Sequence, residues 1–209
     1  MTSSTETTFR IALAPPPDNA LSSYGLPSST TSGGTIDLMA AAFANADYVL
    51  GSSKSVSRYS TGDWPVLYTA TSVDTAIAEK GYWVNRGIFS KNVRPDEVEC
   101  LEYTVSFEGV GLSVIDAVAT NPQLVHPTDY RYCWSVAKDA RDNKVDFLIV
   151  PSARRIGGVN INLFHKTAKF EIGTCVLSVF KLGAGGVVDY VSSSLCCPLV
   201  VDDVFQVFS

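Results

Sequence analysis

The sequence predicts a single α+β domain. Its 209 residues fit one domain of ordinary size, and a compact chain of this length buries roughly 70% of its unfolded surface without a metal or disulfide. Helical patterns lie in the earlier part of the chain, whereas apolar strand patterns dominate after Asp146. This segregation favours an α+β arrangement over alternating βαβ units.

The N-terminal part is expected to lead into this domain. Residues 1–35 are rich in Ser, Thr, Pro and Gly, which is typical of a mobile leader, although a targeting tail and an adaptable surface loop are alternatives. A short strand is expected within it at residues 9–13. A helix then begins at Thr35 or Asp37 and runs to about residue 46, so residues 36–209 form the predicted domain.

The middle of the chain predicts two strands and two helices. Residues 66–70 form an apolar strand, and Ser72 is a suitable N-cap for a helix over residues 73–84. Residues 98–107 alternate as a strand does. Residues 130–142 carry apolar side chains at i, i+3, i+4 and i+7, which is the pattern of an amphipathic helix.

The last part of the chain predicts a run of strands. Apolar stretches are separated here by turn residues, and two of them flank a glycine-rich segment that is typical of a hairpin. These strands are expected over residues 147–150, 159–164, 175–182, 186–191 and 199–208.

Charge and hydropathy exclude several classes of partner. The net charge is −5, and only 18% of residues are charged, so we expect no nucleic-acid partner, because phosphate-backbone binding needs concentrated Lys and Arg. No apolar run reaches the length of a membrane helix, and the polar N-terminus does not resemble a secretory signal. We therefore expect no membrane partner.

The cysteines and histidines argue against a metal site. Five cysteines form no C-x-x-C pair, and only His126 and His165 offer imidazole. Zinc sites need ligands at closer, regular spacing. The cysteines are therefore expected to be buried thiols in a reducing compartment.

Four side chains occupy positions where a binding site can form. Arg58 lies in a loop, and its guanidinium can form a bidentate pair of hydrogen bonds with a phosphate. Tyr68 lies in a strand, Glu79 lies on the small, polar side of a helix, and Ser152 follows an apolar strand. Each also has an ordinary explanation: a surface ion pair, a core aromatic, a helix-surface glutamate and a turn serine.

In order and spacing these residues resemble the RES domain family, which is named for its Arg, Glu and Ser. The resemblance spans about residues 9–165. Many relatives have Trp-Asn after the first Arg, whereas this chain has Tyr59-Ser60, and the segment between Phe9 and Arg58 is longer than in compact relatives. The matching stretches are Phe9-Arg10-Ile11, Ser57-Arg58-Tyr59 and residues 66–70, 75–79, 147–154 and 157–164.

The resemblance implies a fold and an activity. The family's fold is similar to that of ADP-ribosyltransferase toxins, and its members consume NAD⁺ by breaking the nicotinamide–ribose bond. We therefore expect an NAD⁺ glycohydrolase, with NAD⁺ phosphorolysis or protein ADP-ribosylation as alternatives within the family. A catalytically silent nucleotide- or protein-binding domain is the alternative from another class.

The same resemblance implies roles for individual residues. Arg58 would hold the diphosphate or the nearby ribose, Glu79 would bond the nicotinamide ribose, and Tyr68 would pack against nicotinamide. Ser152 would help to seat NAD⁺, Tyr59 would replace the missing Trp, and no metal is involved. The expected catalytic residues are Arg58, Glu79 and Ser152, and the expected NAD⁺-binding residues are Arg58, Tyr59, Tyr68, Ser152 and Arg154.

Partners and location follow from the family as well. RES proteins are mostly toxins of toxin–antitoxin pairs, and some are delivered effectors. The expected partners are thus NAD⁺ and a cognate antitoxin or immunity protein, with a homo-oligomer as a further possibility. The expected location is the cytoplasm, either of the producing cell or of a target cell.

Overall fold

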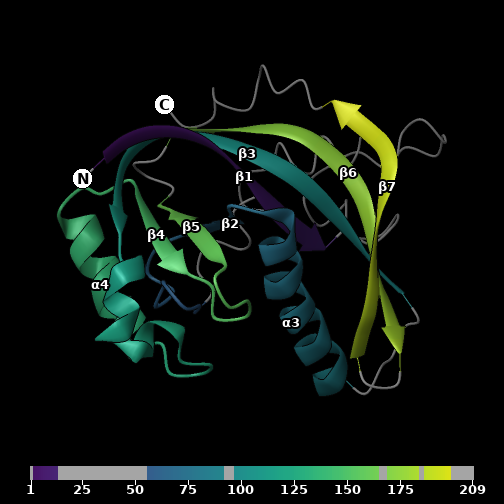
Figure 1. The fold of residues 1–209 in the computed structure, drawn as a ribbon, viewed down its shortest axis with the longest axis horizontal. Helices are drawn as coiled ribbons and strands as arrows, with labels where there is room; N and C mark the ends of the chain where they lie inside the picture. The colour runs from purple at the N-terminus through teal and green to yellow at the C-terminus, as the bar shows by residue number, and fades with distance from the viewer. Residues whose placement is uncertain (1, 14–55, 92–96, 165–168, 184–185, 199–209) are drawn as a thin grey trace.

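The chain folds around one mixed sheet with helices packed beside it (Figure 1), so the expected α+β class is confirmed. The computed structural model describes residues 2–13, 56–91, 97–164, 169–183 and 186–198. Its elements are β1 (Thr2–Leu13), β2 (Leu67–Ala70), α3 (Val73–Lys91), β3 (Glu97–Ser113), the 3-10 helices η2 (Ile115–Ala119) and η3 (Pro122–Val125), α4 (Arg131–Asp142), β4 (Phe147–Pro151), β5 (Val159–Leu163), β6 (Lys169–Gly183) and β7 (Gly186–Pro198).

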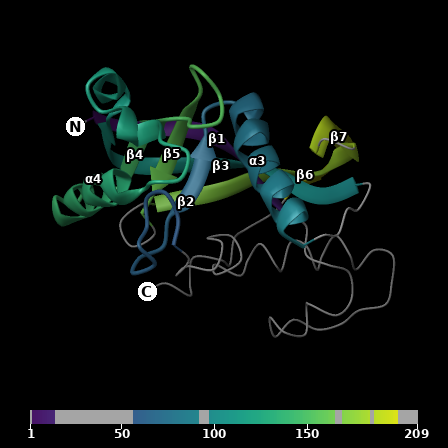
Figure 2. The ribbon, with the colours of Figure 1, turned by 90° about the horizontal axis from the view of Figure 1, so that it is seen from below.

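The sheet closes on itself at one side. Its strand order is β1-β2-β5-β4-β3-β6-β7, and β1 also pairs with β3 along its whole length. Because β1 bonds β2 at Phe9 and Ala70, strands β1, β3, β4, β5 and β2 form a closed circuit of pairings. The β6–β7 hairpin extends from β3, and α3 lies between this hairpin and the short strands β2 and β5 (Figures 1 and 2).

The expected elements that fall within the described residues are found, several of them longer than the sequence indicated. Strands β2, β4 and β5 and the β6–β7 hairpin lie where the apolar runs predicted them. Strand β1 begins at Thr2 rather than at residue 9, because its threonine-rich start pairs with β3 instead of remaining unpaired. The two 3-10 helices were not expected. The helix expected over residues 36–46 and the strand expected over residues 199–208 lie outside the described residues.

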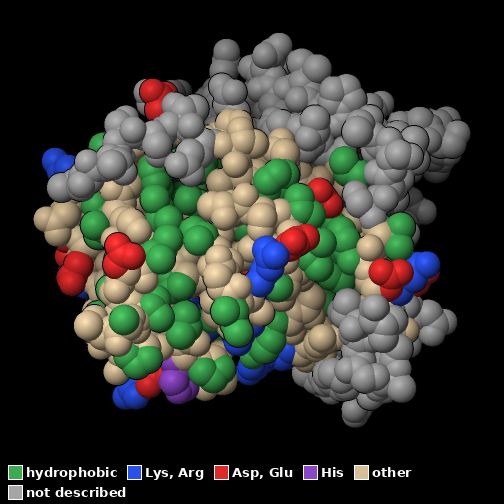
Figure 3. Space-filling view, viewed as in Figure 1, with side chains coloured by type: hydrophobic (Ala, Val, Ile, Leu, Met, Phe, Trp, Pro, Cys, Tyr) green, Lys and Arg blue, Asp and Glu red, His purple; other side chains and the backbone are tan. Residues whose placement is uncertain are grey.

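Two hydrophobic clusters stabilise the fold. One joins α4 to β4, and there Cys133, Ala137 and Ala140 are buried on the helix face that the apolar spacing predicted. The other joins α3 to β1, β3 and β6 and includes Cys100. Both of these cysteines are free thiols. On the face seen in Figure 3, charged side chains of both signs lie scattered among uncharged ones.

A glycine in β3 makes room for an aromatic ring. A Cβ atom at Gly111 would lie 2.2 Å from the ring of Phe147. That ring packs edge to face on Phe107, with centroids 4.8 Å apart. Gly111 therefore serves core packing.

Candidate active site

A cavity of about 380 Å³ opens where β1, β2, α3 and β5 meet the loop before β2. Pockets for small ligands begin at about this volume. Five of the six residues expected at the site line it, and Ser152 does not. The lining residues that concern the chemistry are Arg10, Arg58, Tyr59, Tyr68, Glu79, Lys80, Tyr130, Arg154, Asn160 and Asn162.

Glu79 is the fixed carboxylate of this cavity. Its helix, α3, begins with Ser72, whose Oγ accepts the backbone N–H of Thr75 at 3.3 Å, as expected for an N-cap. Glu79 Oε1 accepts hydrogen bonds from Ser152 Oγ at 2.7 Å and from Asn160 Nδ2 at 2.8 Å. Among the described residues nothing bonds Oε2, so one oxygen is anchored and the other is available to a ligand.

Ser152 lies just past β4 and is 8% exposed. Its Oγ donates to Glu79 and accepts the backbone N–H groups of Arg154 and Arg155, each at 3.1 Å. The backbone N–H of Ser152 donates to the Gly158 carbonyl at 2.8 Å. The serine therefore ties the turn after β4 to α3. Its hydroxyl is thus engaged with protein groups, and its role in seating NAD⁺ stays a prediction.

Arg58 uses one terminal nitrogen for contacts with the protein and leaves the other buried and unbonded in the described structure. Its Nη1 donates to the carbonyls of Leu124 and His126 at 3.3 and 2.8 Å, and its guanidinium lies 4.7 Å from the ring centroid of Tyr130. Its Nη2 is buried without a hydrogen-bond partner in the described structure. A buried guanidinium nitrogen without an acceptor is costly, and an anionic ligand would supply one.

Arg154 bonds the same loop as Arg58, at the neighbouring residue Pro127. Its Nη2 donates to the Pro127 carbonyl at 3.1 Å, and its guanidinium lies 3.4 Å from the ring centroid of Tyr82. Carbonyls within residues 124–127 thus hold both Arg58 and Arg154, which brings two cations to one side of the cavity. Both side chains line the cavity, and their binding of NAD⁺ stays a prediction.

The two tyrosines have different places. Tyr68 lines the cavity, and its hydroxyl bonds Ser57 Oγ at 2.7 Å and accepts the Tyr59 backbone N–H at 2.9 Å. Burial raises the pKa of Tyr68 to about 12. Tyr59 is only 1% exposed and belongs to the core that includes α4. Tyr59 also lines the cavity, but its side chain has almost no free surface, and its role as an aromatic wall for the ligand stays a prediction.

Sequence reasoning missed five of these lining residues. Asn160 and Asn162 lie on one face of β5, paired with Ala70 and Tyr68 of β2. Two asparagines at alternating positions in an otherwise apolar strand were a usable signal. Asn162 is fully buried, and in the described structure neither its amide oxygen nor its amide nitrogen is bonded. The other three missed residues are Arg10, Lys80 and Tyr130.

The described residues offer neither a cluster of metal ligands nor a membrane-spanning helix. Within those ranges no cluster of three or more His, Cys, Asp or Glu side chains could hold a metal ion. None of the helices in the same ranges has the length and apolarity needed to cross a membrane.

Comparison with known proteins places the chain in a family. The RES domain model matches residues 34–176, which is more than half of the sequence, so the chain belongs to the RES domain family. None of the curated proteins matches it. Six chains of solved structures do. One comes from the crystal structure of the M. tuberculosis MbcT-MbcA toxin-antitoxin complex, with 14% identity and a TM-score of 0.49, over 91% of this chain and 85% of that chain.

Proposed function

We propose that this protein consumes NAD⁺ by breaking the bond between nicotinamide and ribose, with water as the acceptor. The observation that carries the proposal is the carboxylate of Glu79, anchored through one oxygen inside a cavity that also holds Arg58 and Arg154. Membership of the RES family supports it, because the resemblance of Arg58, Glu79 and Ser152 to the family's motif implies this chemistry.

The chemistry suits an anchored carboxylate. As the N-glycosidic bond breaks, positive charge develops on the ribose, as it does in the oxocarbenium-like transition states of glycosidases. A carboxylate that is already oriented stabilises this charge without reorganising during the reaction. Ser152 and Asn160 provide that orientation, and Oε2 of Glu79 is the oxygen we assign to the ribose.

The cations and the tyrosine would hold the rest of the substrate. The NAD⁺ diphosphate carries two negative charges, and Arg58 and Arg154 supply two positive ones on one side of the cavity. The planar guanidinium suits phosphate oxygens better than an ammonium would. Tyr68 would orient the nicotinamide ring with its face, since its hydroxyl already bonds Ser57 and Tyr59.

Product analysis tests the reaction. Purified protein is incubated with NAD⁺, with and without inorganic phosphate, and products are identified by mass spectrometry. Nicotinamide with free ADP-ribose supports hydrolysis. ADP-ribose phosphate would indicate phosphorolysis, and a mass increase of a protein would indicate ADP-ribosylation. NAD⁺ binding without release of nicotinamide would overturn the enzymatic proposal and favour the silent binding domain, which the Tyr59-Ser60 departure suggests.

The family also supports a biological role. We propose a toxin or delivered effector that depletes NAD⁺ in a cytoplasm and is held inactive by a cognate antitoxin or immunity protein. Expression from a tight inducible promoter tests this idea. Growth arrest that accompanies falling cellular NAD⁺, and that Glu79→Gln relieves, is the expected result; arrest that is equal with Glu79→Gln would contradict it.

A further inference from the structure

Asn162 of β5 is a buried residue of the cavity wall whose side-chain amide is unbonded. It is 0% exposed and lines the cavity. In the described structure neither its Oδ1 nor its Nδ2 has a hydrogen-bond partner. Burying an amide oxygen and an amide nitrogen without partners is costly, because folding removes the water that both would otherwise bond. A ligand in the cavity that supplies both partners would offset this cost.

The register of β5 places Asn162 beside residues that we assign to the substrate. Residues two apart on a strand share one face of the sheet, about 7 Å from each other, so Asn162 lies on the same face as Asn160, which bonds the Glu79 carboxylate. Across the β2–β5 pairing Asn162 lies directly opposite Tyr68, and the side chains of such a pair are neighbours. The Asn162 amide is therefore next to the tyrosine that we assign to nicotinamide, one step along β5 from the carboxylate that we assign to ribose.

The two unbonded atoms of Asn162 match one functional group of NAD⁺. The carboxamide of nicotinamide has a carbonyl oxygen, which accepts hydrogen bonds, and an NH₂ group, which donates them. Asn162 offers the complementary pair, because its Nδ2 donates and its Oδ1 accepts. Two primary amides that face each other can thus form two parallel hydrogen bonds. An ionised carboxylate has no donor for Oδ1, and an unsubstituted ring would satisfy neither atom.

We propose that Asn162 is a specificity-determining residue that binds the nicotinamide carboxamide through two hydrogen bonds. The proposal rests on the proposed function, because it takes the occupant of this end of the cavity to be the nicotinamide ring of NAD⁺. Since the Asn162 amide has no exposed surface, side chains that line the cavity must shift to admit the ring, and such rotamer changes are common on binding. The paired amides would hold the ring in one orientation while its bond to ribose breaks.

Two dinucleotides that differ only at this group test the proposal. In the acetylpyridine analogue of NAD⁺ a methyl group replaces the amide NH₂, so the analogue keeps the carbonyl but cannot donate to Oδ1 of Asn162. We expect wild type to have the higher kcat/KM for NAD⁺. Asn162→Leu should reduce this preference about tenfold, because the hydrogen bond that distinguishes the two substrates is lost in a site shielded from water. Comparing the preference of two proteins cancels any difference in intrinsic reactivity between the dinucleotides.

Thermal unfolding of the free protein gives a second readout. Leu has nearly the shape of Asn and no polar atoms, so Asn162→Leu removes two unbonded groups from the interior. The variant should unfold at the temperature of wild type or a few degrees higher. Asn143→Leu removes an exposed amide that bonds the Asp139 carbonyl at the end of α4. As the matched control, it should leave the preference between the two dinucleotides unchanged.

The preference for NAD⁺ over its analogue decides between the outcomes. Cleavage of NAD⁺ with the same preference in wild type and Asn162→Leu overturns the role of Asn162 and leaves the proposed function intact. If neither dinucleotide is cleaved, their binding is compared by titration calorimetry. A preference for NAD⁺ that Asn162→Leu loses then retains the carboxamide contact and rejects only the cleavage, whereas equal binding of both overturns the contact as well. If Asn162→Leu does not fold, Asn162→Ala carries the same comparison.

Discussion

The hydroxyl of Ser152 donates a 2.7 Å hydrogen bond to Glu79 Oε1, across a sequence separation of 73 residues. Glu79 comes from α3 and Ser152 from the turn after β4, so the bond forms only when both are packed on the sheet. Asn160 of β5 bonds the same oxygen. The carboxylate is thus oriented by two distant parts of the fold, and this arrangement leads to the first two predictions.

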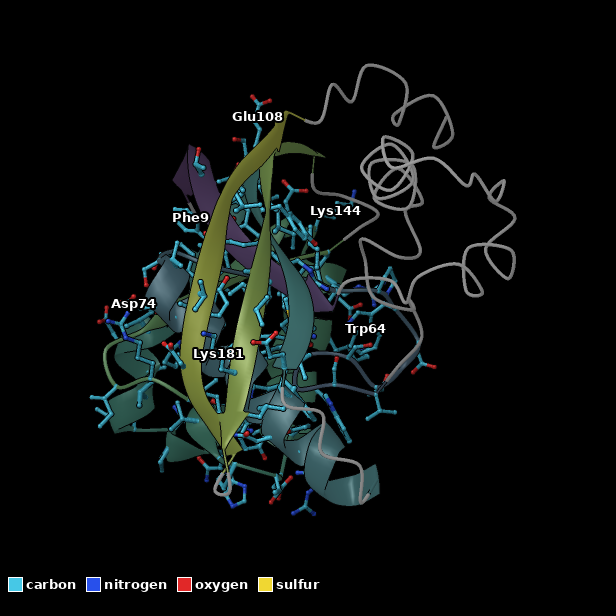
Figure 4. The ribbon with its side chains drawn as sticks, turned by 90° about the vertical axis from the view of Figure 1, so that its right-hand side faces the viewer. Phe9, Trp64, Asp74, Glu108, Lys144 and Lys181 are labelled. Carbon is cyan, nitrogen blue, oxygen red and sulfur yellow. The ribbon has the colours of Figure 1, made fainter. Side chains whose placement is uncertain are left out.

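Replacing Glu79 by Gln should remove the reaction and keep the fold. The amide oxygen can accept the same bonds from Ser152 and Asn160, but the negative charge that would stabilise the ribose is lost. We expect nicotinamide release to fall about 100-fold or more, with an unfolding midpoint within about 3 °C of wild type. Glu108→Gln, an exposed change of equal charge on β3 (Figure 4), is the control. Near-full activity in Glu79→Gln would reject its assigned role.

Replacing Ser152 by Ala should lower kcat more than it changes KM. The variant keeps the charge of Glu79 but loses its anchor, so we expect kcat to fall about 10- to 100-fold, since small losses of orientation are costly. The N–H groups of Arg154 and Arg155 also lose an acceptor, which should destabilise the fold by about 1 kcal/mol. Steady-state kinetics and urea unfolding measure the two effects.

The control for this serine is Ser135→Ala, in which an exposed helical hydroxyl that bonds the Tyr132 carbonyl is removed. It should leave both quantities unchanged. A rise in KM without a fall in kcat for Ser152→Ala would show instead that the serine contacts NAD⁺ directly.

Replacing Arg58 by Ala should weaken NAD⁺ binding. Its free Nη2 is the nitrogen that we assign to phosphate, and a hydrogen bond between charged groups contributes enough for KM to rise about tenfold or more. Arg58→Lys should restore little, because an ammonium cannot contact both the loop carbonyls and a phosphate in the same plane. Arg131→Ala, whose side chain is 82% exposed, is the matched control. An unchanged KM in Arg58→Ala would exclude the phosphate role.

Sequence patterns predicted the fold best where apolar runs meet clear turn residues. Strands β4 and β5 are such runs, separated by a turn that contains Gly157 and Gly158. The full length of β1 could not be predicted, because its Ser- and Thr-rich start has the composition of a leader. Only the pairing with β3 makes this segment a strand, and such pairing over a long sequence distance leaves no local signal.

The site was predictable only as far as the family motif extends. Arg58 and Glu79 line the expected cavity, but Asn160 is recognisable as a partner of Glu79 only from the β2–β5 register. The burial of Tyr59 was not predicted, because its position after Arg58 is where many relatives have Trp, whereas in the structure its side chain belongs to a hydrophobic core cluster. The direction of a side chain in a loop depends on tertiary packing, which the residue types do not encode locally.

Replacing Gly111 by Ala should destabilise the fold. A Cβ atom there would overlap the Phe147 ring, which must shift against Phe107, and overpacking of this kind costs about 1–3 kcal/mol. Gly81→Ala is the matched control: its Cβ would meet Phe180 at 3.5 Å, an ordinary contact within α3. Alanine should stabilise that helix by up to about 1 kcal/mol. Urea unfolding measures both, and equal effects would contradict this packing argument.

Replacing Lys80 by Met should stabilise the protein in a way that depends on pH. The pKa of Lys80 is lowered to about 8 in the folded state from its ordinary 10.5. Between these values the unfolded chain binds a proton that the folded chain has released, so wild-type stability rises with pH across this interval. Below about pH 8 the folded state carries the charge in an unfavourable place, and there Lys80→Met should be more stable by about 1 kcal/mol, a figure reduced for the partial exposure of this side chain.

Urea unfolding of wild type and Lys80→Met at pH 7, 9 and 10.5 measures this difference. The advantage of the variant should shrink as the pH rises, because the wild-type lysine becomes neutral in both states. A difference that is constant over this pH range would show that packing, rather than an unneutralised charge in the cavity, distinguishes the two proteins.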